Sequence, residues 1–253
     1  FVEANLGGAT FARADLQRAD LTGAILARAS LEGGSFVEAR MEGADLREAV
    51  LRGADLRGVQ APKLLVLEAE LTGADFSEAN LNGATFMKCK APGVKFCGAQ
   101  LARATFAELQ AEGANFRGAS AENLRVVLAS TLAGANFVEA RLEAATLRGT
   151  KLADGDFSMA SLVTADLSEC DLARARFYHA VAREARFVRA DLTDAVLIGA
   201  NLMESQCAGA EITRADFSGA NLFRADFGRV RGKARSTLDA LTTRLLVVPR
   251  RQE

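Results

Sequence analysis

The stretch ADFSGANLFRADF, residues 215–227, decides the fold, because a large apolar residue returns at every fifth position. These residues are Phe217, Leu222 and Phe227, and an alanine stands two places before each of them. A step of five turns a helix side chain by about 140°, so no helical face would collect the apolar residues. A flat strand alternates its side chains, so half of them would point into water. An extended chain that turns one corner per five residues keeps the alanine and the large apolar residue on one inner side.

The same spacing runs through most of the chain. We call the large apolar position the centre of a unit. Centres fall at every fifth residue from 1 to 121, where 19 of 25 are Leu or Phe, and from 132 to 227, where 17 of 20 are. One extra residue within 121–131 shifts the register, which we interpret as a bulge. This repetition predicts a solenoid with one continuous core.

Glycine and phenylalanine indicate how the units are arranged. Seventeen of the 22 glycines lie two residues after a centre, where a tight turn needs a positive φ. Phenylalanine gathers at centres spaced by 20 residues, which favours four units per coil and about 11 coils at the roughly 4.8 Å strand spacing. The predicted structural core consists of Phe36, Phe76, Phe96, Phe116, Phe137, Phe157, Phe177 and Phe217.

The units ADLQR, ADFSE and ANLFR resemble those of the pentapeptide-repeat family, whose repeat is A(D/N)LXX. This resemblance implies an all-β fold, a right-handed quadrilateral β-helix, which we expect over residues 1–230. We expect residues 231–253 to form a C-terminal cap and a basic tail. Within them, residues 236–246 are predicted to form a short capping helix, because a helical stripe covering the open edge of the last coil would contain Leu238, Leu241 and Leu245.

The sequence contains no catalytic constellation. The motifs GxxxxGK[ST], HExxH and CxxC are absent, and the lone His179 has no partner at motif spacing. The aspartates mark repeat turns and form no acid–base pair. We therefore expect no enzyme, no cofactor and no metal. The four cysteines are interpreted as free thiols in a reducing compartment, mostly buried. No run of 18 apolar residues and no signal peptide is present, so we expect a cytoplasmic protein without a membrane partner.

Function should then depend on the outer surface. The first hypothesis is a rigid scaffold that binds another protein. The candidate interaction surface, formed by outward apolar residues of the C-terminal half, is Val138, Val163, Tyr178, Ile198, Met203 and Phe223. The chain begins in repeat register, and its closing stretch LDALTTRLLVVPRR is similar to C-terminal pentapeptide domains of bacterial type VI secretion components. That similarity predicts a larger bacterial protein with an upstream domain.

The alternative hypothesis is imitation of DNA. Some pentapeptide-repeat proteins bind DNA gyrase or topoisomerase, imitate a duplex and confer resistance to its inhibitors, and dimerisation through the C-terminal end is typical of them. A duplex carries one negative charge per roughly 1.7 Å, so a rod of about 55 Å would need about 30. Residues 1–227 hold 30 acidic and 24 basic residues, a net charge of −6. The charge counts against imitation, and we expect no direct binding of nucleic acid.

Overall fold

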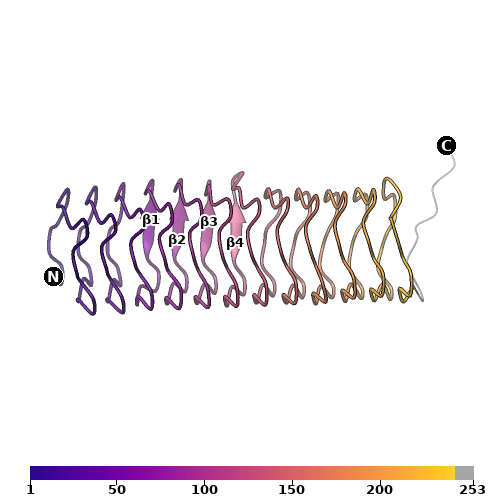
Figure 1. Ribbon diagram of the computed structural model, residues 1–253, viewed down its shortest axis with the longest axis horizontal. Helices are drawn as coiled ribbons and strands as arrows, with labels where there is room; N and C mark the ends of the chain where they lie inside the picture. The colour runs from indigo at the N-terminus through magenta and orange to yellow at the C-terminus, as the bar shows by residue number, and fades with distance from the viewer. Residues whose placement is uncertain (243–253) are drawn as a thin grey trace.

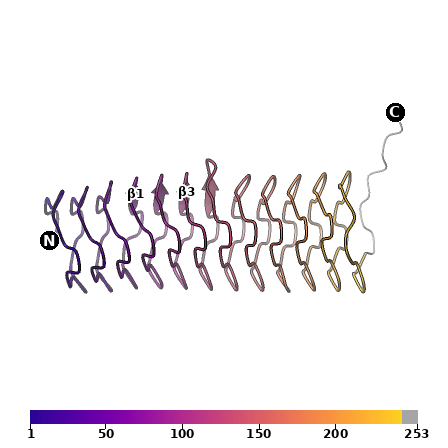
Figure 2. The same cartoon turned by 45° about the horizontal axis from the view of Figure 1, so that its top comes forward.

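The computed structural model describes residues 1–242, which form one tube of stacked coils (Figure 1). Parallel bridges join residues 20 apart from Asn5 and Ile25 to Asn221 and Leu241, except across one register shift where the spacing is 21. Twenty residues therefore complete one coil, and the described residues make about twelve coils. Figure 2 shows the same regular stacking from a second direction. The fold is the right-handed quadrilateral β-helix that the family resemblance implied.

Four short strands lie side by side on one face of the tube. They are β1 (Leu65–Leu67), β2 (Thr85–Met87), β3 (Thr105–Ala107) and β4 (Arg125–Val127). They pair in parallel in the order β1-β2-β3-β4, and the centre of each strand is buried. The other coils are joined by single bridges, and residues 1–242 contain no helix.

The chain visits four faces in each coil, and we name them in that order. They are the Leu21 face, the strand face with β1–β4, the Leu31 face and the phenylalanine face. At most corners the N–H of the third residue after a centre donates to the carbonyl of the centre, as Ala24 does to Leu21 at 3.0 Å. The second residue after the centre holds a positive φ, whether it is Gly23 (65°) or Arg28 (60°).

The phenylalanine face supplies the aromatic part of the core. The eight predicted core rings are at most 1% exposed. Phe116 and Phe137 stack with ring centroids 4.7 Å apart, Phe137 and Phe157 at 4.8 Å, and Phe157 and Phe177 at 4.9 Å. Their planes lie within 6° of parallel, so the rings form a pile along the tube axis.

The register shift is a bulge at the corner after β4. Leu128 and Ala129 both hold φ of 55°, and the next bridge joins Gln110 to Thr131, 21 residues apart. Figures 1 and 2 show this corner reaching further outward than its neighbours. The coils before and after the bulge keep the same four faces, because the extra residue is absorbed at the corner.

The expected C-terminal helix is wrong over the residues that the structure describes. Ser236 and Leu241 instead bridge to Asp216 and Asn221 of the preceding coil, and Asp239 takes the positive φ of a repeat turn at 56°. The N–H of Phe217 donates to the carbonyl of Ser236 at 2.9 Å, so the edge of one coil binds the backbone of the next. These hydrogen bonds stabilise a further coil more than the short stripe of leucines would stabilise a helix. Residues 243–246 of the predicted helix lie outside the described residues.

Candidate protein-binding surface

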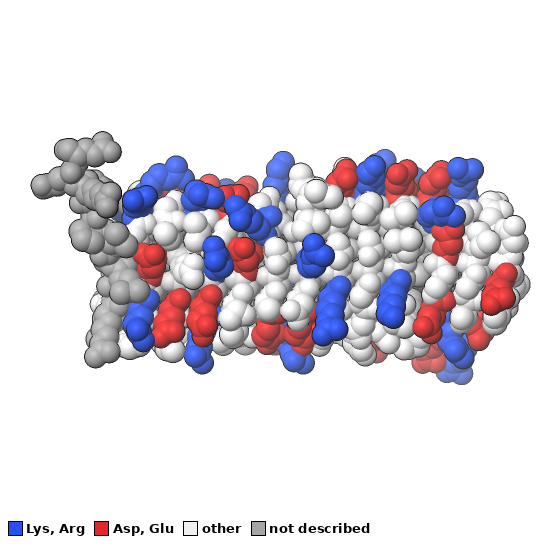
Figure 3. All heavy atoms as spheres, turned by 180° about the vertical axis from the view of Figure 1, so that it is seen from behind, with Lys and Arg blue, Asp and Glu red and all other residues white. Residues whose placement is uncertain are grey.

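Most of the outer surface carries charges that neutralise one another. Arg28 and Glu48, 20 residues apart, occupy the same corner position in successive coils and pair at 3.1 Å. Arg174 and Asp154 repeat this arrangement at 2.7 Å. On the face that Figure 3 shows, blue and red side chains are interspersed along the tube, without an unbroken acidic area. The repeat therefore places ion pairs between successive coils, and the tube is not a polyanionic rod.

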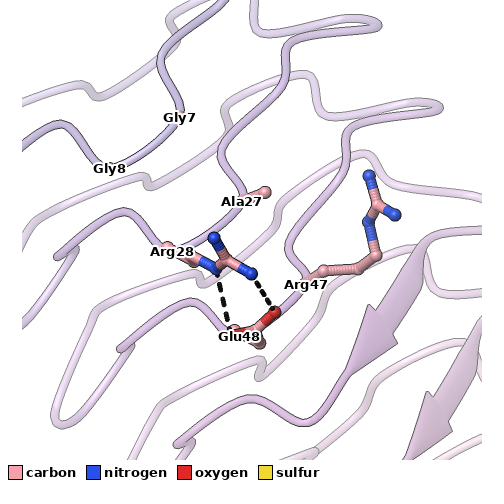
Figure 4. A pocket seen from close by; sticks show the side chains of 6 residues that line it. All are labelled: Gly7, Gly8, Ala27, Arg28, Arg47 and Glu48. Carbon is pink, nitrogen blue, oxygen red and sulfur yellow. Dashed lines mark hydrogen bonds and ion pairs between the residues drawn. The ribbon is translucent and has the colours of Figure 1, made fainter.

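A hollow near the first coils shows such ion pairs in detail. It is lined by Gly7, Gly8, Ala27, Arg28, Arg47 and Glu48. Figure 4 shows the guanidinium of Arg28 bonded to Glu48, whereas Arg47 points away from this pair. Arg47 donates instead to Asp45 at 2.6 Å. Hydrogen bonds from Arg28 lower the pKa of Glu48, so this carboxylate stays ionised. Both arginines already have partners, and the hollow has no free cation for an anionic ligand.

One corner lacks charge altogether. It lies between the phenylalanine face and the Leu21 face, in the coils from residue 158 to residue 221. We call this set of residues the neutral corner; none is Asp, Glu, Lys or Arg. Its members are Ser158, Met159, Ser161, Tyr178, His179, Val181, Ile198, Gly199, Asn201, Ser218, Gly219 and Asn221.

Apolar side chains stand out from the neutral corner. Met159 is 54% exposed, Tyr178 39% and Val181 37%. The ring of His179 lies over the next coil, because a Cβ added at Gly199 would come within 2.5 Å of its Nδ1. Gly199 holds φ of 65°, so it supplies both the turn and the space for the ring. The surface therefore carries no carboxylate, lysine or arginine and is partly apolar.

The sequence-predicted interaction residues lie in two columns, one that runs through this corner and one beside it. Val138, Tyr178 and Ile198 follow centres of the phenylalanine face, and Ser158 separates the first two. Val163, Met203 and Phe223 follow centres of the Leu21 face, with Arg183 between the first two. Tyr178 is exposed, and the other five are half-buried against neighbouring coils. The structure thus brings Tyr178 next to Ile198 and Met203 next to Phe223, but leaves Val138 and Val163 apart from them.

Sequence reasoning missed Met159 and Val181, two exposed apolar residues of the neutral corner. They occupy positions that usually hold polar residues, so they were not among the columns of outward apolar residues. The signal that could have found them is the absence of charge across neighbouring columns in consecutive coils. Within residues 1–242 no group of His, Cys, Asp and Glu is arranged to hold a metal ion.

Two of the three leucines expected to cap the C-terminal end lie among the described residues. Leu238 is 69% exposed and Leu241 48% exposed on the last described coil. Leu245 lies outside the described residues. The homodimer contact expected at this end therefore stays a prediction.

The family model for pentapeptide repeats matches residues 1–36, 24–59, 67–90, 129–162, 160–197, 170–205 and 190–229. These segments cover most of the chain, which therefore belongs to the pentapeptide-repeat family. Proteins of this family are generally structural or interaction proteins and not enzymes. No curated protein matches the chain.

Solved structures of pentapeptide-repeat proteins resemble the chain. HetL, which is involved in heterocyst differentiation regulation in the cyanobacterium Nostoc, is 25% identical over 97% of this chain and 87% of its own, with a TM-score of 0.38. Full-length QnrB1, a plasmid-mediated fluoroquinolone resistance protein, is 20% identical over 79% of this chain and 91% of its own, with a TM-score of 0.50. The likeness to QnrB1 concerns the fold alone. No helix among the described residues is long and apolar enough to cross a membrane.

Proposed function

We propose that this chain is a non-enzymatic scaffold that binds a protein partner at the neutral corner. The observation that carries the proposal is a charge-free surface in a tube whose other outward positions are rich in ion pairs. Burying a charge without a partner is costly, so interface cores are depleted of charge and enriched in Tyr, Met and Phe. Tyr178, Met159 and the flanking Met203 and Phe223 match that composition.

The proposal includes a bacterial, cytoplasmic setting and a larger parent protein. The similarity of the closing stretch to pentapeptide domains of type VI secretion components supports this part. A tube with one continuous core is well suited to hold a partner at a fixed distance from other domains.

A substitution that places a charge in the neutral corner tests the function. Val181→Arg and Tyr178→Glu keep the core intact, because both side chains point outward. The matched control is Ile25→Arg, which changes an exposed apolar residue (41%) on the strand face. The partner is isolated by photo-crosslinking to position 178 in the full-length parent protein, and its Kd is then measured for each variant.

We expect Val181→Arg and Tyr178→Glu to weaken binding by about tenfold or more, because each buries an unpaired charge. Ile25→Arg should bind as the unmodified protein does, and all variants should melt at the same temperature. Equal affinity of the two corner variants and the control would show that the partner binds elsewhere.

The alternative, imitation of DNA, has less support from the surface. Arg18 bonds Glu38 at 2.8 Å, and Arg57 bonds Asp55 at 2.7 Å, so many carboxylates already have a cation. A gyrase would meet these paired charges in place of a row of phosphates.

A further inference from the structure

The bulge after β4 exposes an apolar side chain, Leu128, that is not part of the buried core. Leu128 is 61% exposed, more than any other large apolar residue between positions 1 and 237. It lies at the corner between the strand face and the Leu31 face, diagonally opposite the neutral corner. Its backbone and that of Ala129 both hold φ of 55°, a conformation that costs a non-glycine residue about 1–2 kcal/mol.

A buried hydroxyl holds the bulge in this conformation. Ser130 is 1% exposed, and its Oγ donates to the carbonyl of Val127 at 2.8 Å. The same Oγ accepts the N–H of Leu109 at 3.1 Å. The hydrogen bond between coils next to the bulge is long, since the N–H of Glu108 reaches the carbonyl of Val127 at 3.3 Å. The Ser130 hydroxyl is thus satisfied both as donor and as acceptor, and it links the corner to the preceding coil.

An acidic hollow of about 470 Å³ lies beside Leu128. Its lining contains two carboxylates and no lysine or arginine: Glu108, Gln110, Glu112, Leu128, Ala129 and Thr131. Glu112 accepts a hydrogen bond from the hydroxyl of Thr131. Over residues 1–242, the ion pairs include neither Glu108 nor Glu112. Just over half of the carboxylates in residues 1–242 stand in an ion pair, and these two belong to the remainder.

Lysines stand in the coils on either side of the hollow, and one of them, Lys88, precedes Glu108 in its own column and pairs with Glu68 at 4.0 Å. In the column that contains Gln110 and Thr131, Lys90 precedes them and Lys151 follows. Lys90 pairs with Glu70 at 3.1 Å, whereas Lys151 shares only a backbone bridge with Asp171. No lysine among the described residues pairs with Glu108 or Glu112, so both carboxylates are open to a cation from another molecule.

We propose that Leu128 and the hollow beside it are a second docking point, which takes a protein segment with an apolar side chain next to a lysine or arginine. The apolar side chain of the partner packs on Leu128 and Ala129, and its cation lies between Glu108 and Glu112. Charge complementarity selects the basic partner, and the apolar contact gives most of the affinity. This docking point is independent of the neutral corner.

Synthetic 15-residue peptides test the proposal on the whole chain. One set places Leu or Phe two or three residues from Lys or Arg, and the matched set carries Glu in place of each cation. Leu128→Gly removes the apolar side chain and suits the positive φ, so this variant should fold at least as well. The matched control is Met159→Gly, which removes a 54% exposed side chain with φ of 57° at the opposite corner.

We expect the basic set to bind more tightly than the acidic set by about fivefold or more. Leu128→Gly should weaken that binding by about tenfold, as the loss of a buried leucine contact implies. Glu108→Gln with Glu112→Gln should abolish the preference for basic peptides, whereas Met159→Gly should leave binding unchanged. Failure of both sets to bind, equal binding of the two sets, or unchanged binding by Leu128→Gly would overturn the proposal. Met159→Gly should affect only the partner of the neutral corner, which separates the two proposals.

Discussion

At the scale of single residues, the turn position shows how the sequence tolerates a strained backbone. The second residue after each centre holds a positive φ, and many of these residues are Arg or Glu in place of glycine, such as Arg18 and Glu38. A left-handed conformation is unfavourable for such residues. Their side chains, however, pair along the tube, as Arg18 does with Glu38 at 2.8 Å. Charged residues at the turn position therefore accept backbone strain, and in return they give the tube a charged surface.

The stacked rings give a first prediction. Phe157→Ala should lower the free energy of unfolding by about 3–5 kcal/mol, because the ring is fully buried between Phe137 and Phe177. Phe157→Leu is the control, since Leu56 and Leu197 already occupy this column, and it should cost about 1.5 kcal/mol or less. Chemical denaturation measures both values. Equal losses for the two variants would contradict a tightly packed pile of rings.

The cysteines give a second prediction. Burial raises the pKa of the Cys89 thiol to about 11, and those of Cys170 and Cys207 to about 12. These thiols stay protonated near neutral pH and are shielded from reagents. Cys97 is half-buried on an outward position. A chromogenic disulfide reagent at pH 8 should therefore find one fast thiol in the native protein and four after unfolding. A second fast thiol in the native state would be inconsistent with the buried positions.

At the scale of elements, the bulge is a corner that absorbs one residue without altering the coils around it. Its stability depends on the Ser130 hydroxyl, which joins Leu109 and Val127. Ser130→Ala should cost about 1–3 kcal/mol, because a buried N–H then loses its acceptor. Ser161→Ala, at a half-buried outward position, should cost less than about 0.5 kcal/mol. Thermal unfolding compares them, and similar losses would show that the hydroxyl does not hold the corner.

The elements also show where sequence reasoning reaches its limit. The spacing of apolar centres predicts the four faces and the core, because burial follows directly from a period of five. The stripe of Leu238 and Leu241 predicts a helix and fails there, since the edge of the preceding coil offers hydrogen bonds that no sequence pattern expresses. The neutral corner is only partly predictable. Met159 and Val181 become part of it through the stacking of coils, and not through their own sequence neighbourhood.

At the scale of the whole molecule, ion pairs spread along the tube link stability to pH. Hydrogen bonds from Arg47, Arg174 and Arg214 hold the pKa values of Asp45, Asp154 and Asp194 below their ordinary range. A carboxyl whose pKa is lowered by folding stabilises the folded state above its unfolded pKa, and that contribution is lost as the pH falls through the folded pKa.

The melting temperature should therefore stay nearly constant from pH 7 down to about pH 5 and fall steeply below about pH 4. Added salt should weaken the exposed pairs and reduce the size of this fall. A scan of melting temperature against pH at two salt concentrations checks both statements. A loss of stability that begins near pH 6 would point to groups other than these carboxylates.

The paired charges also bear on imitation of DNA. Because many carboxylates along the tube are paired with arginine or lysine, we expect no effect of micromolar protein on supercoiling by DNA gyrase, with or without a quinolone inhibitor. The control is a protein of the family that is active in the same assay. Inhibition of supercoiling, or protection from the drug, would show that one face is more acidic than the ion pairs imply.

The coil length has a consequence for how the two docking points are placed. Twenty inserted residues between Phe137 and Phe157 would move the neutral corner about 4.8 Å further from Leu128 along the axis, without rotation. Five inserted residues would instead rotate everything downstream by a quarter turn, so that both points came to face the same flank. The distance between the two docking points along the axis thus changes in steps of 20 residues, and the angle between them changes in steps of five. Duplication of a short piece of the gene can change either quantity.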